Sequence, residues 1–152
     1  QQVGVEDKTL VKAYSDDFFA EIVYKKKTMP HAVEALEYLS SKYNLYILSN
    51  GFRELQEQKM RSAGVDKFFK KVVLSEDIGV HKPFPEIFYF AMSATQSELH
   101  TSLMIGDNWK NDVAGAKDAG LGQIFYNVNK TTKFPFQPTG IIEDWNEIGK
   151  IL

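Results

Sequence analysis

Short apolar runs alternate with longer amphipathic stretches along this sequence, and that alternation restricts the folds open to the chain. The apolar runs predict strands at 45–48, 72–74, 103–105 and 123–126, followed by an extended segment at 140–142. The remaining stretches predict helices at 9–24, 31–42, 52–63 and 145–152, a helix that Pro85 opens and a helix that ends at Gly120. Strands that alternate with helices are typical of a parallel sheet covered by helices. We therefore expect an α/β fold with a three-layer, doubly wound parallel sheet.

Composition narrows the classes of protein further. The chain has 152 residues, 43% hydrophobic and 25% charged, which is enough for one core in a single domain. A formal net charge of -2 gives no general attraction to polyanions, so neither a nucleic-acid polymer nor a membrane is an expected partner. The absence of cysteine excludes disulfides, thiolate catalysis and Cys-ligated metals, and it fits a reducing compartment. A cytoplasmic location is the corresponding prediction.

Three polar residues follow three of the predicted strands. Ser49 comes directly after strand 45–48, Lys82 lies in the loop after strand 72–74, and Asp107 follows strand 103–105. Open parallel sheets bind their ligands beyond the carboxyl ends of their strands. A hydroxyl, an ammonium and a carboxylate beside helix N-termini suit a phosphate ester held with a divalent cation. The pattern therefore predicts a phosphate site at this edge of the sheet.

The acids of the segment MIGDNWKNDVAGAKDAG fit this interpretation. Asp107 would be a hard oxygen ligand for Mg²⁺, and Gly106 would let the backbone come close. Asp112, in the first turn of the next helix, could orient the waters of the metal or hold Lys82. A face of small residues would let that helix lie tightly on the sheet, namely Ala114, Gly115, Ala116 and Ala119.

Each residue also has a simpler interpretation. Ser49, Asn50 and Gly51 could form only a turn and a helix cap, and Lys82 could be a solvated lysine before a proline. Asp107 and Asp112 could be a turn residue and an N-cap. The order in which these residues occur, each after a strand, favours a common site. The three histidines, His31, His81 and His100, show no metal-ligand spacing.

Three segments resemble the second, third and fourth motifs of the haloacid dehalogenase-like hydrolases, a family with a Rossmann-like sheet and a helical cap. These segments are LYILSNG, GVHKPFPEIF and MIGDNWKNDVAGA. The resemblance implies that Ser49 binds a phosphoryl oxygen, with Asn50 and Gly51 in the phosphate-binding loop. It implies that Lys82 balances the charge of the nucleophile and the phosphate. Asp107 would bind Mg²⁺ as the cofactor, and Asp112 would support the catalytic site.

The sequence is especially similar to the subgroup of nucleoside 5′-monophosphate phosphatases and related small-phosphate hydrolases. The implied function is a Mg²⁺-dependent phosphatase that acts on a small phosphorylated substrate through an aspartyl-phosphate. Alternatives are a phosphomutase or a dehalogenase of the same family, a receiver-like phosphoacceptor domain, or a non-catalytic binding module. Receiver domains, however, place their acidic metal site before the Ser/Thr and Lys-Pro, whereas Asp107 follows them here.

The chain departs from the family at its first motif. Members attack phosphorus with an aspartate in an Asp-x-Asp motif after the first strand, and no such strand and motif precedes residue 9. The resemblance places that strand between strands 45–48 and 103–105. We therefore expect residues 1–28 to be the C-terminal part of a helical cap and residues 29–152 to be the core without its first strand. The missing N-terminal segment would complete the enzyme.

Overall fold

A computed structural model describes residues 7–23 and 26–152 of the chain. The helices are α1 (Lys8–Val23), α2 (Ala32–Lys42), α3 (Arg53–Ser62), α4 (Pro85–Thr95) and α5 (Gly115–Asp118). The strands are β1 (Tyr46–Ser49), β2 (Lys71–Leu74), β3 (Leu103–Gly106), β4 (Gly122–Tyr126) and β5 (Gly140–Ile142). Each predicted strand is present and its ends lie within one residue of the prediction. The last residue of the predicted helix 9–24 lies outside the described residues.

All described strand pairs are parallel, as predicted. β1 pairs with β2 in the register Ser49 to Leu74, and β3, β4 and β5 form a second ladder in that order. Within the described part of the chain, no ladder joins β1 to β3. These are the two strands between which the sequence analysis places a further strand.

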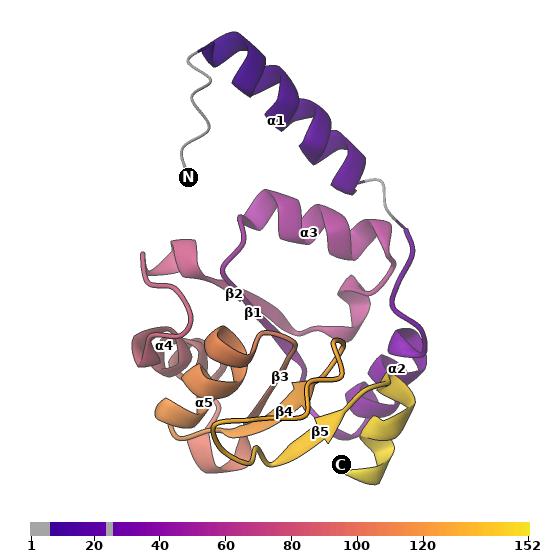
Figure 1. Ribbon diagram of the computed structural model, residues 1–152, viewed down its shortest axis with the longest axis vertical. Helices are drawn as coiled ribbons and strands as arrows, with labels where there is room; N and C mark the ends of the chain where they lie inside the picture. Colours follow the sequence, from indigo (N-terminus) through magenta and orange to yellow (C-terminus); the bar gives the residue numbers. More distant parts are fainter. Residues whose placement is uncertain (1–6, 24–25) are drawn as a thin grey trace.

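Helices cover both faces of the strands, which confirms the three-layer α/β fold (Figure 1). On one face, α2 and the C-terminal turn η5 (Trp145–Lys150) pack on β4 and β5 through Ala35, Leu39, Ile124, Ile142 and Ile148. On the other face, the cluster contains Ile87 and Phe88 of α4, Ala116 of α5, and Ala119 directly after α5. β3 joins both clusters, since Leu103 and Ile105 pack against the first and Met104 against the second. Side chains that alternate between two covered faces are expected of an interior parallel strand.

Two segments differ in detail from the expected α-helices. The segment after Asp107 begins with a π-helical turn, η4 (Trp109–Ala114), before α5, and Gly120 follows with a φ of 87°. The C-terminal segment is a 3₁₀ helix that ends at Lys150, with Asp144 and Glu147 in a capping box at its start. α1 contacts α3 and lies on the side of α3 that faces away from the strands (Figure 1). None of the helices in the described ranges has the length and apolar composition needed to cross a membrane.

Candidate active site

The predicted site residues lie at the carboxyl ends of the strands. Ser49 is the last residue of β1, and Asp107 directly follows β3. Lys82 lies between the short turn η2 (Ser75–Asp77), which follows β2, and α4. Because Lys82 contacts both the end of β1 and the segment after β3, the carboxyl ends of the two ladders meet at one edge. The fold therefore brings the predicted residues to that edge.

The ammonium group of Lys82 is enclosed at the centre of this site. Its Nζ donates to the backbone oxygen of Leu48 over 2.8 Å and to Oδ1 of Asp112 over 2.6 Å. The side chains of Lys82 and Asp112 are only 10% and 7% exposed. Removing one partner of a buried ion pair leaves the other charge without compensation. The pair therefore ties the third predicted motif to the fourth.

Asp112 is held from a second side. Its Oδ2 accepts a hydrogen bond from the backbone N–H of Asn108 over 3.0 Å. The π-helical turn brings the N–H groups of Asp112 and Val113 to the carbonyl oxygen of Asn108, at 2.8 and 3.4 Å. Single π-helical turns within helices are frequent at functional sites. Each carboxylate oxygen of Asp112 thus accepts one hydrogen bond, and the two bonds fix the side chain beside Lys82.

The loop after β1 is organised by its own polar groups. The backbone N–H of Gly51 donates to Oγ of Ser49 over 3.1 Å, so the hydroxyl serves as an acceptor within the loop. Its own O–H can still donate to a ligand, because a hydroxyl carries one donor and two lone pairs. The carboxamide of Asn50 binds the backbone of Lys82 through both its oxygen and its nitrogen.

Asp107 differs from Asp112 in being exposed to solvent. No hydrogen bond to its carboxylate is found within the described part of the chain. Its charge nevertheless affects the interior: burial raises the pKa of Tyr126, and the negative charges of Asp144 and Asp107 raise that pKa further. Asp107 therefore offers an open carboxylate beside the end of β4.

An open carboxylate suits a magnesium ion, which typically takes one or two protein carboxylates together with substrate phosphate oxygens and waters. Among the described residues, no group of three or more His, Cys, Asp or Glu side chains could hold a metal by itself. Asp107 thus fits as one protein ligand of Mg²⁺, and the described residues do not supply the full set of ligands.

An aromatic cluster lies next to this acidic loop. The ring of Trp109 stacks on Phe134 with centroids 5.0 Å apart, contacts Phe136 at 4.9 Å and meets Phe125 edge to face at 5.2 Å. Phe134 and Phe136 belong to the loop between β4 and β5, so the cluster fixes that loop against the segment after Asp107.

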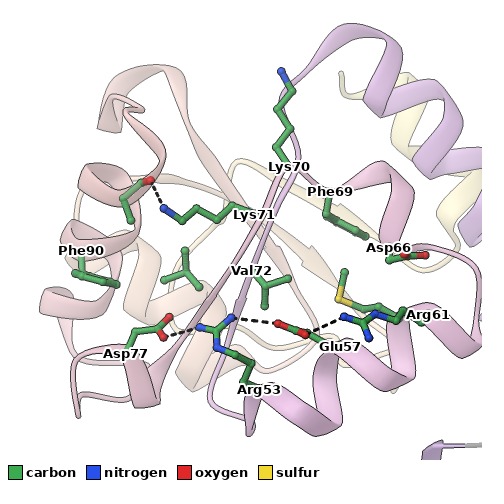
Figure 2. Close-up of a pocket in the computed structure, with 13 residues that line it drawn as sticks. Arg53, Glu57, Arg61, Asp66, Phe69, Lys70, Lys71, Val72, Asp77 and Phe90 are labelled. Atoms are coloured by element: carbon green, nitrogen blue, oxygen red, sulfur yellow. Dashed lines mark hydrogen bonds and ion pairs between the residues drawn. The ribbon is translucent and has the colours of Figure 1, made fainter.

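A separate groove of about 540 Å³ lies along β2, between α3 and α4 (Figure 2). None of the predicted site residues lines it. Its charged groups largely pair with one another: Arg53 contacts Glu57 and Asp77, and Arg61 contacts Glu57. Figure 2 shows these pairs as a row across the groove. Both arginines of the groove are thus paired with neighbouring carboxylates, and the candidate site is the edge at Lys82.

Several contacts of the site were not predicted from the sequence. The carbonyl oxygen of Leu48 and the N–H of Asn108 are backbone groups, and their roles depend on the meeting of distant segments. The attachment of Asn50 to Lys82 likewise joins residues 32 positions apart. The contact between Lys82 and Asp112 was one of the two options that the sequence analysis left open.

A parallel sheet covered on both faces, with a serine, a buried lysine and two aspartates at its carboxyl edge, is the arrangement expected of the Rossmann-like hydrolases that the three motifs resemble. Residues 1–126 match the model of the family described as haloacid dehalogenase-like hydrolase. The chain belongs to this family, which confirms the resemblance that its three motifs indicated.

Proteins named as phosphatases are among the relatives. Pyrimidine 5′-nucleotidase YjjG of Escherichia coli (strain K12) is 32% identical over 118 residues, which are 77% of this chain and 51% of that protein. Glyceraldehyde 3-phosphate phosphatase of Pyrococcus abyssi is 34% identical over 88 residues, or 58% of this chain and 37% of that protein. The chain thus spans about half or less of the length of these relatives.

A solved structure agrees with the fold. The HAD-hydrolase YfnB of Bacillus subtilis, crystallised with magnesium, superposes with a TM-score of 0.83 at 26% identity, covering 94% of this chain and 67% of the other. A 2-haloacid dehalogenase of Pseudomonas syringae superposes with a TM-score of 0.77 at 23% identity, covering 97% and 64%. The second likeness shows the common fold alone.

Proposed function

We propose that the intact protein is a Mg²⁺-dependent phosphatase that hydrolyses a small phosphoric monoester. The main support is the ammonium of Lys82, which is buried, fixed by Asp112 and by the Leu48 carbonyl, and located at the strand ends. A positive charge that is fixed in advance stabilises the negative charge of a phosphoryl group without reorganisation during the reaction. The exposed carboxylate of Asp107 directly follows β3, at the same carboxyl edge of the strands.

Each predicted residue has a role in this proposal. The hydroxyl of Ser49 donates to a phosphoryl oxygen while the Gly51 N–H keeps the hydroxyl in place. Lys82 balances the charge of the phosphate and of the attacking carboxylate. Asp107 is a ligand of Mg²⁺, which when bound neutralises phosphate charge as a Lewis acid. Asp112 acts by holding Lys82, because its Oδ1 accepts from Nζ while its Oδ2 is fixed by the Asn108 N–H.

The nucleophile belongs to a segment that the described strands do not include. We propose that a strand ending in an aspartate pairs with the inner edges of β1 and β3, which no described ladder joins. The carboxylate of that aspartate attacks phosphorus, the ester oxygen leaves as the alcohol, and water then releases phosphate from the aspartyl-phosphate. In this arrangement residues 1–28 are part of a cap and residues 29–152 belong to the core. The greater length of the relatives supports this assignment.

For the substrate we propose a nucleoside 5′-monophosphate or another small phosphorylated metabolite. The motif resemblance supports this class, and the relatives include a pyrimidine 5′-nucleotidase and a glyceraldehyde 3-phosphate phosphatase. A dehalogenase is less well supported, because the solved dehalogenase structure is only 23% identical to the chain and shares its fold alone. A phosphomutase would carry its distinguishing acid–base residue in the same unassigned segment.

The test uses the full-length protein after treatment with EDTA. Purified protein is assayed with p-nitrophenyl phosphate and with a panel of nucleoside monophosphates, with and without added Mg²⁺. We expect Mg²⁺-dependent release of phosphate, abolished by Asp107→Asn with no change in the far-UV circular dichroism spectrum. Asp118→Asn, which alters an exposed acid on α5, is the matched control. Phosphate release that is independent of Mg²⁺, or unaffected by Asp107→Asn, would contradict the proposal.

A further inference from the structure

The side chain of Asn50 is attached to the backbone of Lys82 at two points. Its Oδ1 accepts the Lys82 N–H over 2.8 Å, and its Nδ2 donates to the Lys82 carbonyl oxygen over 3.0 Å. This is the pairing that a neighbouring strand would offer, since one amide satisfies both the donor and the acceptor of one residue. The loop after β1 is thereby joined to the loop after β2 beyond the point where their ladder ends.

Lys82 is consequently held at both of its ends by residues that flank Ser49. Asn50 binds the backbone of Lys82, and the carbonyl of Leu48 binds its Nζ over 2.8 Å. Asp112 binds the same Nζ from the segment after β3. Without the Asn50 contact, a flexible four-carbon side chain would connect Nζ to a backbone that has lost both of its hydrogen bonds to the loop after β1. The position of the ammonium relative to Ser49 therefore depends on both attachments.

We propose that Asn50 is a positioning residue, whose carboxamide fixes the backbone of Lys82 so that Nζ is delivered between Leu48 and Asp112. This inference rests on the proposed phosphatase function and refines the predicted phosphate-binding role of Asn50. The carboxamide acts through Lys82 and does not contact the phosphate itself. Its oxygen and one of its N–H groups bind the lysine backbone.

Because Asn50 is exposed, removing its side chain should change the position of Lys82 without a large loss of protein stability. Asn50 is exposed, whereas Lys82 and Asp112 are nearly buried. Water can replace the hydrogen bonds of an exposed amide at little net cost, so removing the amide leaves the core intact. The same removal lets the backbone of Lys82 move. A misplacement of about 1 Å at a catalytic group can lower turnover by ~100-fold.

The experiment measures the freedom of Nζ in the full-length protein. Asn50→Ala removes both hydrogen bonds, and Asn44→Ala is the matched control, since Asn44 is an exposed asparagine before the other end of β1. Each protein is treated with a limiting amount of an amine-acylating reagent, and modification of Lys82 is quantified by peptide mass spectrometry. Lys130, which is 77% exposed, serves as the internal reference in the same sample.

We expect Lys82 to be modified several-fold faster in Asn50→Ala than in the parent and in Asn44→Ala. We also expect kcat for the phosphate ester to fall by ~10- to 100-fold in Asn50→Ala alone. A fall in kcat with Lys82 still protected would show that Asn50 contacts the substrate, and unchanged values of both would show that the attachment is dispensable. Either result overturns the proposal.

The labelling result needs no enzymatic turnover. If the parent protein shows no phosphatase activity, the proposed function fails while the positioning of Lys82 by Asn50 is still decided. Should Asn50→Ala not fold, Asn50→Asp keeps the oxygen acceptor and loses the donor, and the same comparison of Lys82 with Lys130 applies. An Asn50→Asp protein in which Lys82 stays as protected as in the parent would then contradict the proposal.

Discussion

Gly106 and Asp112 lie so close together that no side chain fits between them. A methyl group on residue 106 would lie 2.4 Å from Cβ and 2.4 Å from Oδ2 of Asp112. The last residue of β3 therefore has to be glycine for the carboxylate to lie against the strand and reach Lys82. Gly106 was predicted to let the backbone come close at the metal site; the crowding at Gly106 instead comes from the side chain of Asp112.

Gly106→Ala should consequently displace Asp112 from Lys82. We expect a loss of about 1–3 kcal/mol in the free energy of unfolding, as for other overpacked interior sites. Phosphatase activity should fall at the same time, because the ammonium loses its fixed partner. Urea denaturation and a steady-state assay of the full-length protein test both effects. Gly149→Ala is the control, since its nearest neighbour would lie at an ordinary contact distance of 3.7 Å.

Replacing Lys82 with methionine keeps much of the side-chain volume and removes the charge. Turnover should fall by at least ~100-fold, as for other single electrostatic stabilisers. The variant should also be destabilised by about 3–5 kcal/mol, because Asp112 is left as a buried, uncompensated carboxylate. Adding Asp112→Asn should restore most of the stability and none of the activity. Recovery of turnover in the double variant would show that the charge of Lys82 is not used in the reaction.

The fold could be predicted from the sequence to a large extent, and the site only in part. Residues such as Ile105 and Ile124 belong to short apolar runs between amphipathic helices, and that local pattern is sufficient to predict a parallel sheet. Ser49, Lys82 and Asp107 were found because each follows a strand. The attachment of Asn50 to Lys82 left no local signal, since it depends on how two loops meet. The division of the strands into two ladders was anticipated only through the family resemblance.

A further prediction concerns the pH dependence of stability. The Leu74 N–H lowers the pKa of Asp77 in the folded protein, and Arg53, 2.5 Å away, lowers it further. Because this pKa is lower in the folded than in the unfolded chain, the stabilisation is present above the unfolded value of about 3.9 and is lost as pH falls through the folded value. Asp77→Asn should therefore cost about 1 kcal/mol near neutral pH and progressively less below about pH 4.

Urea midpoints of the parent and of Asp77→Asn, measured across that pH range, test this sign. Asp66→Asn is the control, because Asp66 is an exposed acid that lines the same groove. A difference between the parent and Asp77→Asn that persists or grows towards low pH would contradict the assignment.

The aromatic contact between Trp109 and Phe134 links the loop before β5 to the segment that carries Asp107. The two rings are stacked, with an interplanar angle of 23°, and Phe136 contacts the same indole. Phe134→Ala removes one ring of this partly buried cluster, so we expect a loss of about 1–2 kcal/mol in stability. Hydrogen exchange should become faster in 107–114 as well as in the loop itself, because the indole loses its stacked neighbour. Tyr89→Ala, which removes an exposed ring on α4, should change neither. If exchange in Phe134→Ala rises only within the loop, the cluster holds the loop in place without restraining the acidic segment.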